Sequence, residues 1–81
     1  MGALEIAIRS NDFPATTTVD GPVVITWRNA SGEDHDVEFG VGANLGTMKQ
    51  GGTVQRRFDT PGRFSYYCTF HDDMAGVIVV R

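Results

Sequence analysis

Apolar and polar residues alternate in several short segments of this chain, a period of two that is typical of strands with one buried face. In the segment 23–28, for example, Val23, Ile25 and Trp27 alternate with more polar neighbours. The pattern predicts seven strands, at 4–9, 16–19, 23–28, 35–39, 53–58, 63–68 and 76–80. We expect Trp27, Phe64 and Tyr66 to point into a core, with Tyr66 pinning a corner of the fold.

Residues typical of turns separate these segments. They are Asp20-Gly21-Pro22, Ser31-Gly32, a glycine-rich stretch at 40–52, and Pro61-Gly62. No stretch of helical period is long enough to compete with the strands. Short strands with such spacing predict an antiparallel β-sandwich.

The length of 81 residues and the 41% apolar composition are enough for one modest core, so we expect a single domain over 1–81. No apolar run approaches the roughly 20 residues of a membrane helix, and we expect no membrane span. The N-terminus has neither the basic nor the apolar region of a signal peptide, so we expect a mature chain.

The charge pattern argues against binding to nucleic acid. The formal net charge is −3, and the basic residues form no cluster larger than Arg56-Arg57. Half of the acidic residues instead flank the two histidines, namely Glu33, Asp34, Asp36, Asp72 and Asp73.

Four residues have the chemistry of a metal site. Cys68, His71 and Met74 follow one another at intervals of three residues, and His35 lies on an earlier predicted strand, on its core face. Two imidazoles, a thiolate and a weak thioether suit copper that alternates between two oxidation states. Taken singly, each has an ordinary alternative: a buried small cysteine, a hydrogen-bonded structural histidine and a gap-filling methionine.

The sequence "YYCTFHDDMAGVIVV" at 66–80 resembles the ligand loop of the cupredoxins, the small blue copper proteins that include amicyanin and plastocyanin. The stretches "FPATTTVDGPVVITWRN", "HDV" and "FDTPGRFSYYC" are similar to other parts of that family. The resemblance implies a Greek-key, all-β sandwich of about seven to eight strands. It also implies that His35, Cys68, His71 and Met74 hold one type 1 copper ion.

The resemblance further implies one-electron transfer between Cu(II) and Cu(I), with no enzymatic activity and no catalytic residue. Redox proteins would dock transiently near His71, within an apolar ring that includes Leu45, Met48 and Phe70. We expect a monomer in the periplasm or outside the cell.

Three features depart from the family pattern. Phe70 replaces a proline, and its N–H could donate to the cysteine sulfur. Asp36 stands where the family commonly has asparagine, and it could accept hydrogen bonds from Thr69. Asp72 and Asp73 follow His71, where related loops tend to be apolar, and they would favour a basic partner surface.

Three other functions remain open at this stage. A copper carrier or storage module would use the same soft ligands and exchange metal quickly. An enzyme could use a Cys–His pair as nucleophile and base, although no further catalytic group is evident. A purely structural sandwich would bind no metal.

Overall fold

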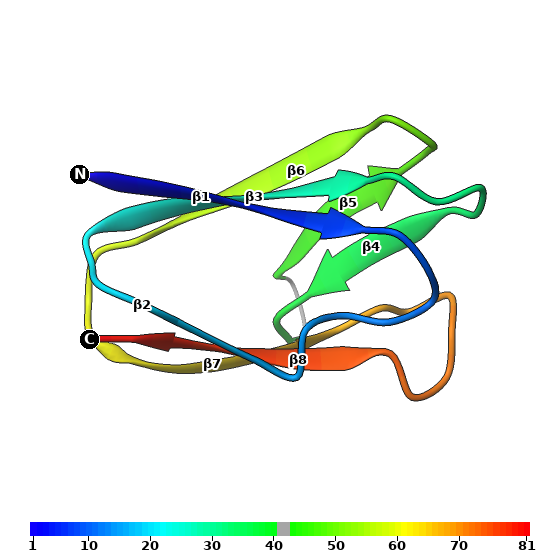
Figure 1. The fold of residues 1–81 in the computed structure, drawn as a ribbon. Coiled ribbons are helices and arrows are strands. Elements are labelled where there is room, and N and C mark those ends of the chain that lie inside the picture. Colours follow the sequence, from blue (N-terminus) through cyan, green and yellow to red (C-terminus); the bar gives the residue numbers. More distant parts are fainter. Residues whose placement is uncertain (41–42) are drawn as a thin grey trace.

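A computed structural model describes residues 1–40 and 43–81 as eight β-strands in two sheets, shown in Figure 1. The strands are β1 (Gly2–Ile8), β2 (Thr16–Val19), β3 (Val23–Asn29), β4 (His35–Glu38), β5 (Asn44–Met48), β6 (Thr53–Phe58), β7 (Gly62–Tyr67) and β8 (Ala75–Val80). The first sheet has the order β1-β3-β6, and the second has the order β2-β8-β7-β4-β5. This all-β sandwich confirms the predicted fold class. No helix in the described residues is long and apolar enough to cross a membrane.

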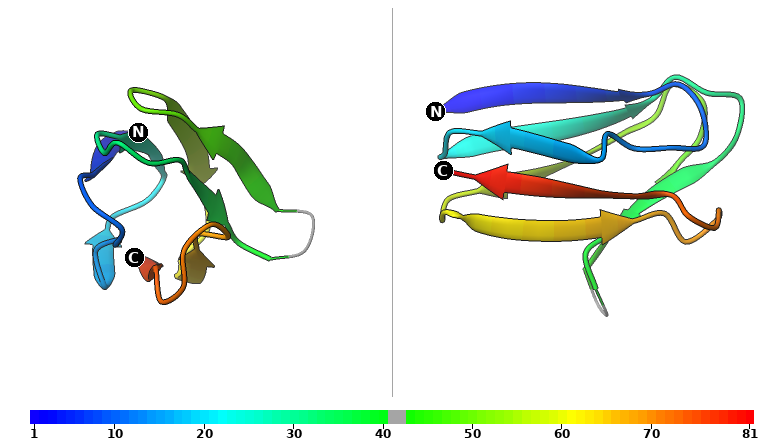
Figure 2. Two further views of the ribbon diagram at one scale, coloured as in Figure 1. Left: turned by 90° about the vertical axis from the view of Figure 1, so that its right-hand side faces the viewer. Right: turned by 60° about the horizontal axis from the view of Figure 1, so that its bottom comes forward.

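The strand pairing differs from the predicted antiparallel sandwich in two places. Strand β1 pairs with β3, and β2 pairs with β8, and both pairs are parallel. The chain crosses from one sheet to the other between β1, β2 and β3, as the two views in Figure 2 show. After the crossing to β2 and back, β3 runs in the same direction as β1, whereas a hairpin would have reversed the direction of the chain.

Strand β5 lies within the glycine-rich stretch that we expected to be a loop. Glycines are depleted in strands, so the pattern gave little indication of one here. Gly46 has a φ of 110°, a value that glycine adopts easily. Val41 and Gly42, which also fall within that predicted loop, lie outside the described residues.

The core between the sheets contains the residues that alternation placed inside. Its centre is aromatic: Trp27 and Tyr66 are buried with ring centroids 5.3 Å apart, and Phe13 lies 4.7 Å from Tyr66. Phe64 is only partly buried and packs against this cluster. The hydroxyl of Tyr66 is buried without a hydrogen-bond partner among the described residues, so the predicted corner-pinning bond is absent there. Burial raises the pKa of Tyr66.

One end of the sandwich brings distant segments together. The termini lie at the left of Figure 1, and the loop between β7 and β8 lies at the right, beside the start of β4. Glu38 of β4 pairs with Tyr67 at the end of β7. Because these strands are antiparallel, the chain beyond Tyr67 continues along β4 toward His35.

Candidate metal centre

His35 begins strand β4 and is fully buried, with 0% of its surface exposed. Strand β4 lies between β7 and β5, so its first residue faces the loop that follows β7. The Nδ1 atom of His35 is 3.9 Å from Sγ of Cys68, while Nε2 lies 2.8 Å from the Ser31 hydroxyl. The ring therefore presents Nδ1 to Cys68 and Nε2 to Ser31, which lies just before β4 in the chain.

The loop from Cys68 to Met74 carries the other three predicted ligands. The Cys68 N–H donates to the Met74 carbonyl over 2.9 Å, so a backbone bond closes the loop. Asp73 adopts a φ of 62°, a left-handed conformation that aspartate tolerates better than most residues and that helps the loop turn. Cys68 and Met74 at its two ends are both buried, whereas His71 between them is partly exposed.

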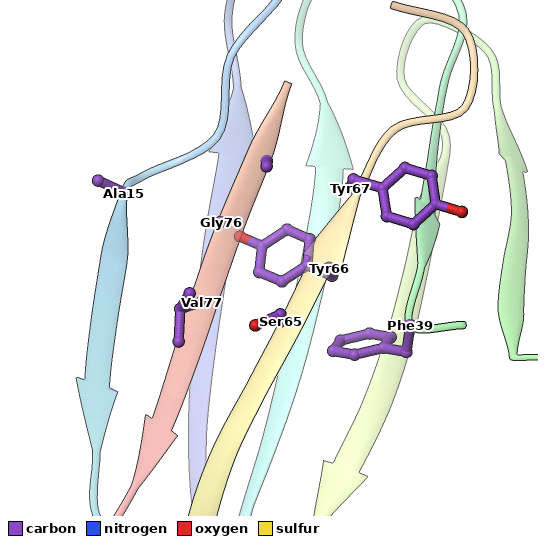
Figure 3. Close-up of a pocket in the computed structure, with 8 residues that line it drawn as sticks. Ala15, Phe39, Ser65, Tyr66, Tyr67, Gly76 and Val77 are labelled. Atoms are coloured by element: carbon purple, nitrogen blue, oxygen red, sulfur yellow. The ribbon is translucent and has the colours of Figure 1, made fainter. Parts of the chain in front are cut away.

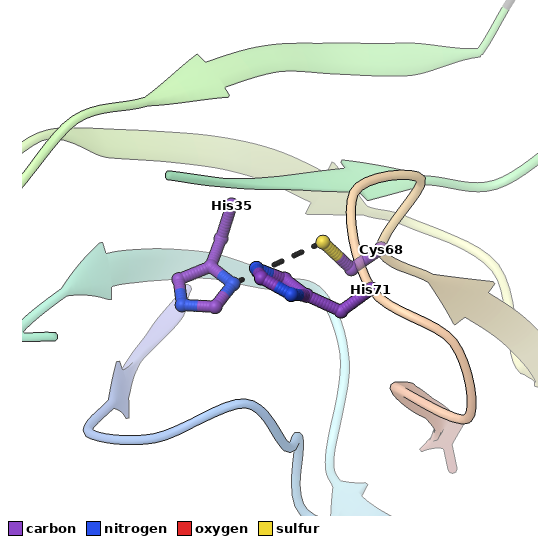
Figure 4. Close-up of side chains that lie close together, drawn as sticks. All are labelled: His35, Cys68 and His71. Atoms are coloured by element: carbon purple, nitrogen blue, oxygen red, sulfur yellow. Dashed lines mark hydrogen bonds between the residues drawn. The ribbon is translucent and has the colours of Figure 1, made fainter. Parts of the chain in front are cut away.

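Three donor atoms converge across this end of the sandwich. The ligand atoms of His35, Cys68 and His71 all lie within 4.8 Å of one another, and Figure 4 shows the three side chains around a common space. Metal–nitrogen and metal–sulfur bonds are about 2.0 and 2.3 Å long, so two ligands of one ion in a trigonal arrangement lie about 3.7 Å apart. The 3.9 Å separation between His35 and Cys68 fits one ion between them.

Met74 lies beside two of these donors, Cys68 and His71. It is 1% exposed and lines a hollow of about 410 Å³ together with Cys68 and His71. A thioether is a weak, soft ligand that suits the axial position of a copper site. Its role as a fourth ligand stays a prediction.

The surroundings of the two imidazoles bear on which ring nitrogen can bind a metal. Burial lowers the pKa of His35, and the neighbouring His71 lowers it further, against the opposing effect of three acidic residues, Glu33, Asp34 and Asp36. His35 is therefore neutral at neutral pH. Nε2 of His71 lies 3.1 Å from the Asp34 carbonyl, which can only accept. Nε2 of His71 thus carries a proton, which leaves Nδ1 as the nitrogen that could bind a metal.

Asp36 ties the two ligand-bearing segments together, as the sequence predicted. Its carboxylate accepts from the Thr69 N–H at 2.7 Å and from the Thr69 hydroxyl at 2.5 Å. It also accepts from the Asn44 side chain at 2.9 Å. Burial alone would raise the pKa of Asp36, but these hydrogen bonds outweigh it and hold the pKa below that of an ordinary aspartate.

Two expectations about the surroundings of the site are not met. Met48 is 1% exposed and belongs to the core, so it cannot form part of a surface ring. Phe70 is 51% exposed and does lie at the surface, as expected. Within residues 1–40 and 43–81, however, its N–H makes no hydrogen bond to the Cys68 sulfur.

Asn29 and Ser31 are buried beside His35, although the sequence pattern predicted no role for either. One indication was available. Asn29 continues the inward-facing series of Val23, Ile25 and Trp27 on β3 and is the polar member of that series. A fully buried asparagine requires hydrogen-bond partners, and this need could have directed attention to its neighbours.

A larger hollow, of about 520 Å³, lies on the outer face of the second sheet (Figure 3). Its outward-facing lining includes Ser65, Tyr67 and Val77, which alternate with the buried Tyr66 and Ile78. It contains none of the four predicted ligands. The convergence of donor atoms, rather than the size of the cavity, identifies the candidate site.

Comparison with known proteins relates the whole chain to small copper proteins. No protein-family model matches it. It is 29% identical over 87 residues to amicyanin-alpha of Methylorubrum extorquens, in an alignment that covers 99% of this chain and 73% of that protein. It is 28% identical over 82 residues to the chloroplastic plastocyanin of Tetradesmus obliquus, which covers 84% of this chain. The chain spans 57% of that plastocyanin's length.

Solved structures extend this similarity to three dimensions. The fold matches that of a reduced amicyanin variant carrying a proline-to-phenylalanine substitution with a TM-score of 0.88 and 30% identity, over 99% of this chain and 83% of the other. A methionine-to-alanine variant of amicyanin in its Cu(I) form matches with a TM-score of 0.87 and 27% identity, over 98% and 82%. From its strands, its cluster of donor atoms and these relatives, the chain belongs to the cupredoxins.

Proposed function

We propose that this protein is an electron carrier in which His35, Cys68 and His71 would hold one copper ion, with Met74 as a weak fourth ligand. The observation that carries the proposal is the convergence of the three stronger donors within 4.8 Å, from segments more than thirty residues apart. The related amicyanin has been solved with Cu(I), in line with this choice of metal.

The donor set favours copper over other common ions. Thiolate and thioether sulfur suit Cu(I), and imidazole suits both oxidation states. Copper bound there would supply one-electron exchange between Cu(II) and Cu(I). Zinc would accept the same thiolate and imidazoles but has no redox chemistry.

The protein contributes a rigid frame. His35 lies on a strand inside the sheet, and Asp36 links that strand to Thr69, next to Cys68. Ligands held by packed, hydrogen-bonded segments move little when their charge changes. The same frame argues against an enzyme with Cys68 as nucleophile, because Cys68 is only 3% exposed and His35 is fully buried.

The partners are proposed to be redox proteins that dock briefly around the loop of His71. The exposed Phe70 supplies apolar surface there, Leu45 lies partly buried on β5, and Asp72 and Asp73 supply negative charge. A small, transient interface is usual for electron transfer. We propose a monomer that acts in the periplasm or outside the cell, a proposal that rests on the family resemblance alone.

Addition of Cu(II) to the apo protein tests this function. We expect an intense blue thiolate-to-copper absorption band and reversible one-electron reduction. Cys68→Ser should abolish the band. Met74→Leu should alter its intensity and the reduction potential, whereas Met48→Leu, at an equally buried methionine, should change neither.

Other outcomes would favour other functions. A blue protein that loses its copper rapidly to a chelator would support a copper carrier or storage module. A protein that binds no copper at all would contradict the proposal.

A further inference from the structure

The orientation of the Asn29 side chain is determined by two backbone carbonyls. Asn29 ends strand β3 and is fully buried. Its Nδ2 lies 2.6 Å from the Glu33 carbonyl and 2.9 Å from the Met48 carbonyl. Carbonyl oxygens only accept, so the amide nitrogen must face them and Oδ1 must face the other way.

Oδ1 of Asn29 in turn determines the direction of the Ser31 hydroxyl. It lies 3.0 Å from the Ser31 N–H and 2.7 Å from Ser31 Oγ. Oδ1 has no proton to donate, so Ser31 must donate through both its backbone and its hydroxyl. If the hydroxyl pointed elsewhere, two buried acceptors would face each other at 2.7 Å, at considerable cost.

The Ser31 hydroxyl can therefore only accept from His35. Its single proton is used by Asn29, and Nε2 of His35 lies 2.8 Å from Oγ. A second acceptor of that proton, the Glu33 carbonyl at 3.2 Å, leads to the same result. Nε2 must carry the imidazole proton, and the lone pair on Nδ1 then faces Cys68 Sγ.

We propose that Asn29 and Ser31 are positioning residues that fix His35 as the Nε2–H tautomer and orient its Nδ1 toward the metal. This inference rests on the proposed copper site. Hydrogen-bonding partners of this kind orient metal-bound imidazoles generally. What is particular to this chain is that the orientation starts at two peptide carbonyls and reaches the ring through two side chains.

The first test requires no metal and no substitution of Asn29 or Ser31. The ring ¹⁵N shifts of apo protein at neutral pH distinguish the two neutral tautomers, and a His71→Gln variant leaves only the His35 signals. We expect a single species protonated at Nε2. A His35 protonated at Nδ1, or a mixture of both tautomers, would overturn the proposal.

The second test removes the acceptor. In Ser31→Ala we expect the single tautomer to be lost and copper affinity, measured by competition with a chelator, to fall by about 10- to 100-fold. Ser31→Thr retains a hydroxyl and should restore both. Ser65→Ala, at an exposed serine on β7, is the matched control and should keep wild-type affinity.

The two possible failures are distinguishable. If Ser31→Ala keeps the tautomer and the affinity of the wild type, the positioning role is rejected while the copper site stands. If the wild-type protein binds no copper, the proposed function itself is rejected.

Discussion

Asp36 shows how one buried carboxylate can connect two parts of a site. It follows His35 on β4 and accepts two hydrogen bonds from Thr69, which follows Cys68. An asparagine at this position would present an N–H₂ group where Asp36 accepts from Asn44 and the Thr69 hydroxyl. The aspartate is therefore the better partner for the three donors that surround it.

We expect Asp36→Asn to lower the free energy of unfolding of the apo protein by about 1–3 kcal/mol at neutral pH, because hydrogen bonds to an ionised group are lost. The pKa of Asp36 is lowered by folding. The stability that ionised Asp36 contributes is therefore fully present above the pKa of an aspartate in the unfolded chain, about 4. It is lost as the pH falls through the lower pKa that Asp36 has in the folded protein. Urea denaturation of both proteins at neutral pH and near pH 2.5 measures this difference.

Asp12→Asn, at an exposed carboxylate, is the control and should have little effect at either pH. A difference between wild type and Asp36→Asn that stays constant from neutral to acid pH would contradict this account.

Strand β8 depends on a glycine at one position. Gly76 pairs with Tyr66 across the sheet. A Cβ built there would lie 2.7 Å from the Pro14 carbonyl oxygen and 2.8 Å from the Tyr66 hydroxyl. The first atom is part of the backbone and the second belongs to the buried Tyr66, so the chain would have to move.

Gly76→Ala should therefore destabilise the protein by about 1–3 kcal/mol, measured by urea or thermal denaturation. Gly32→Ala is the matched control, because a Cβ there meets nothing within 4 Å. It should leave stability unchanged or raise it by up to about 1 kcal/mol. Equal denaturation midpoints for the two variants would show that β8 can shift without cost.

Strand prediction succeeded where side chains alternate and failed where they do not. Strands were expected around 16–19 and 53–58, and β2 and β6 lie there, with side chains that alternate between more exposed and more buried positions. Strand β5 was missed, because it contains a glycine and is flanked by others. Its existence depends on pairing with β4, where His35 lies opposite Met48.

At the scale of the whole molecule, fewer of the acidic residues near the site are free to meet a partner than the sequence indicated. Of the five acidic residues around the histidines, Asp36 is buried and Asp34 pairs with Lys49 at 2.9 Å. Within the described residues, Glu33, Asp72 and Asp73 are exposed and form no ion pair. Of these three, Asp72 and Asp73 lie on the His71 loop itself, where a docking partner would meet them.

We expect the copper protein to react faster with a small cationic redox complex than with an anionic one. At high salt the ratio of the two rates should fall by up to about tenfold. Asp72→Asn combined with Asp73→Asn should remove most of the salt dependence. Stopped-flow rates at several ionic strengths give the measurement.

The control is Asp20→Asn combined with Asp59→Asn, which changes the net charge equally at the opposite end of the sandwich and breaks only exposed ion pairs. If both double variants reduce the salt dependence alike, the overall charge is responsible and local docking at the His71 loop is not.

The sequence by itself determined most strands, the residues that face the core, and the order and spacing of the four predicted ligands. These are local properties, because strand periodicity and loop length involve residues close together in the chain. Only the tertiary structure decided which strands pair in parallel, that His35 meets Cys68 across 33 positions, and that Asn29 and Ser31 orient the His35 ring. Such contacts depend on the register of strands distant in sequence, and the pattern along the chain does not specify that register.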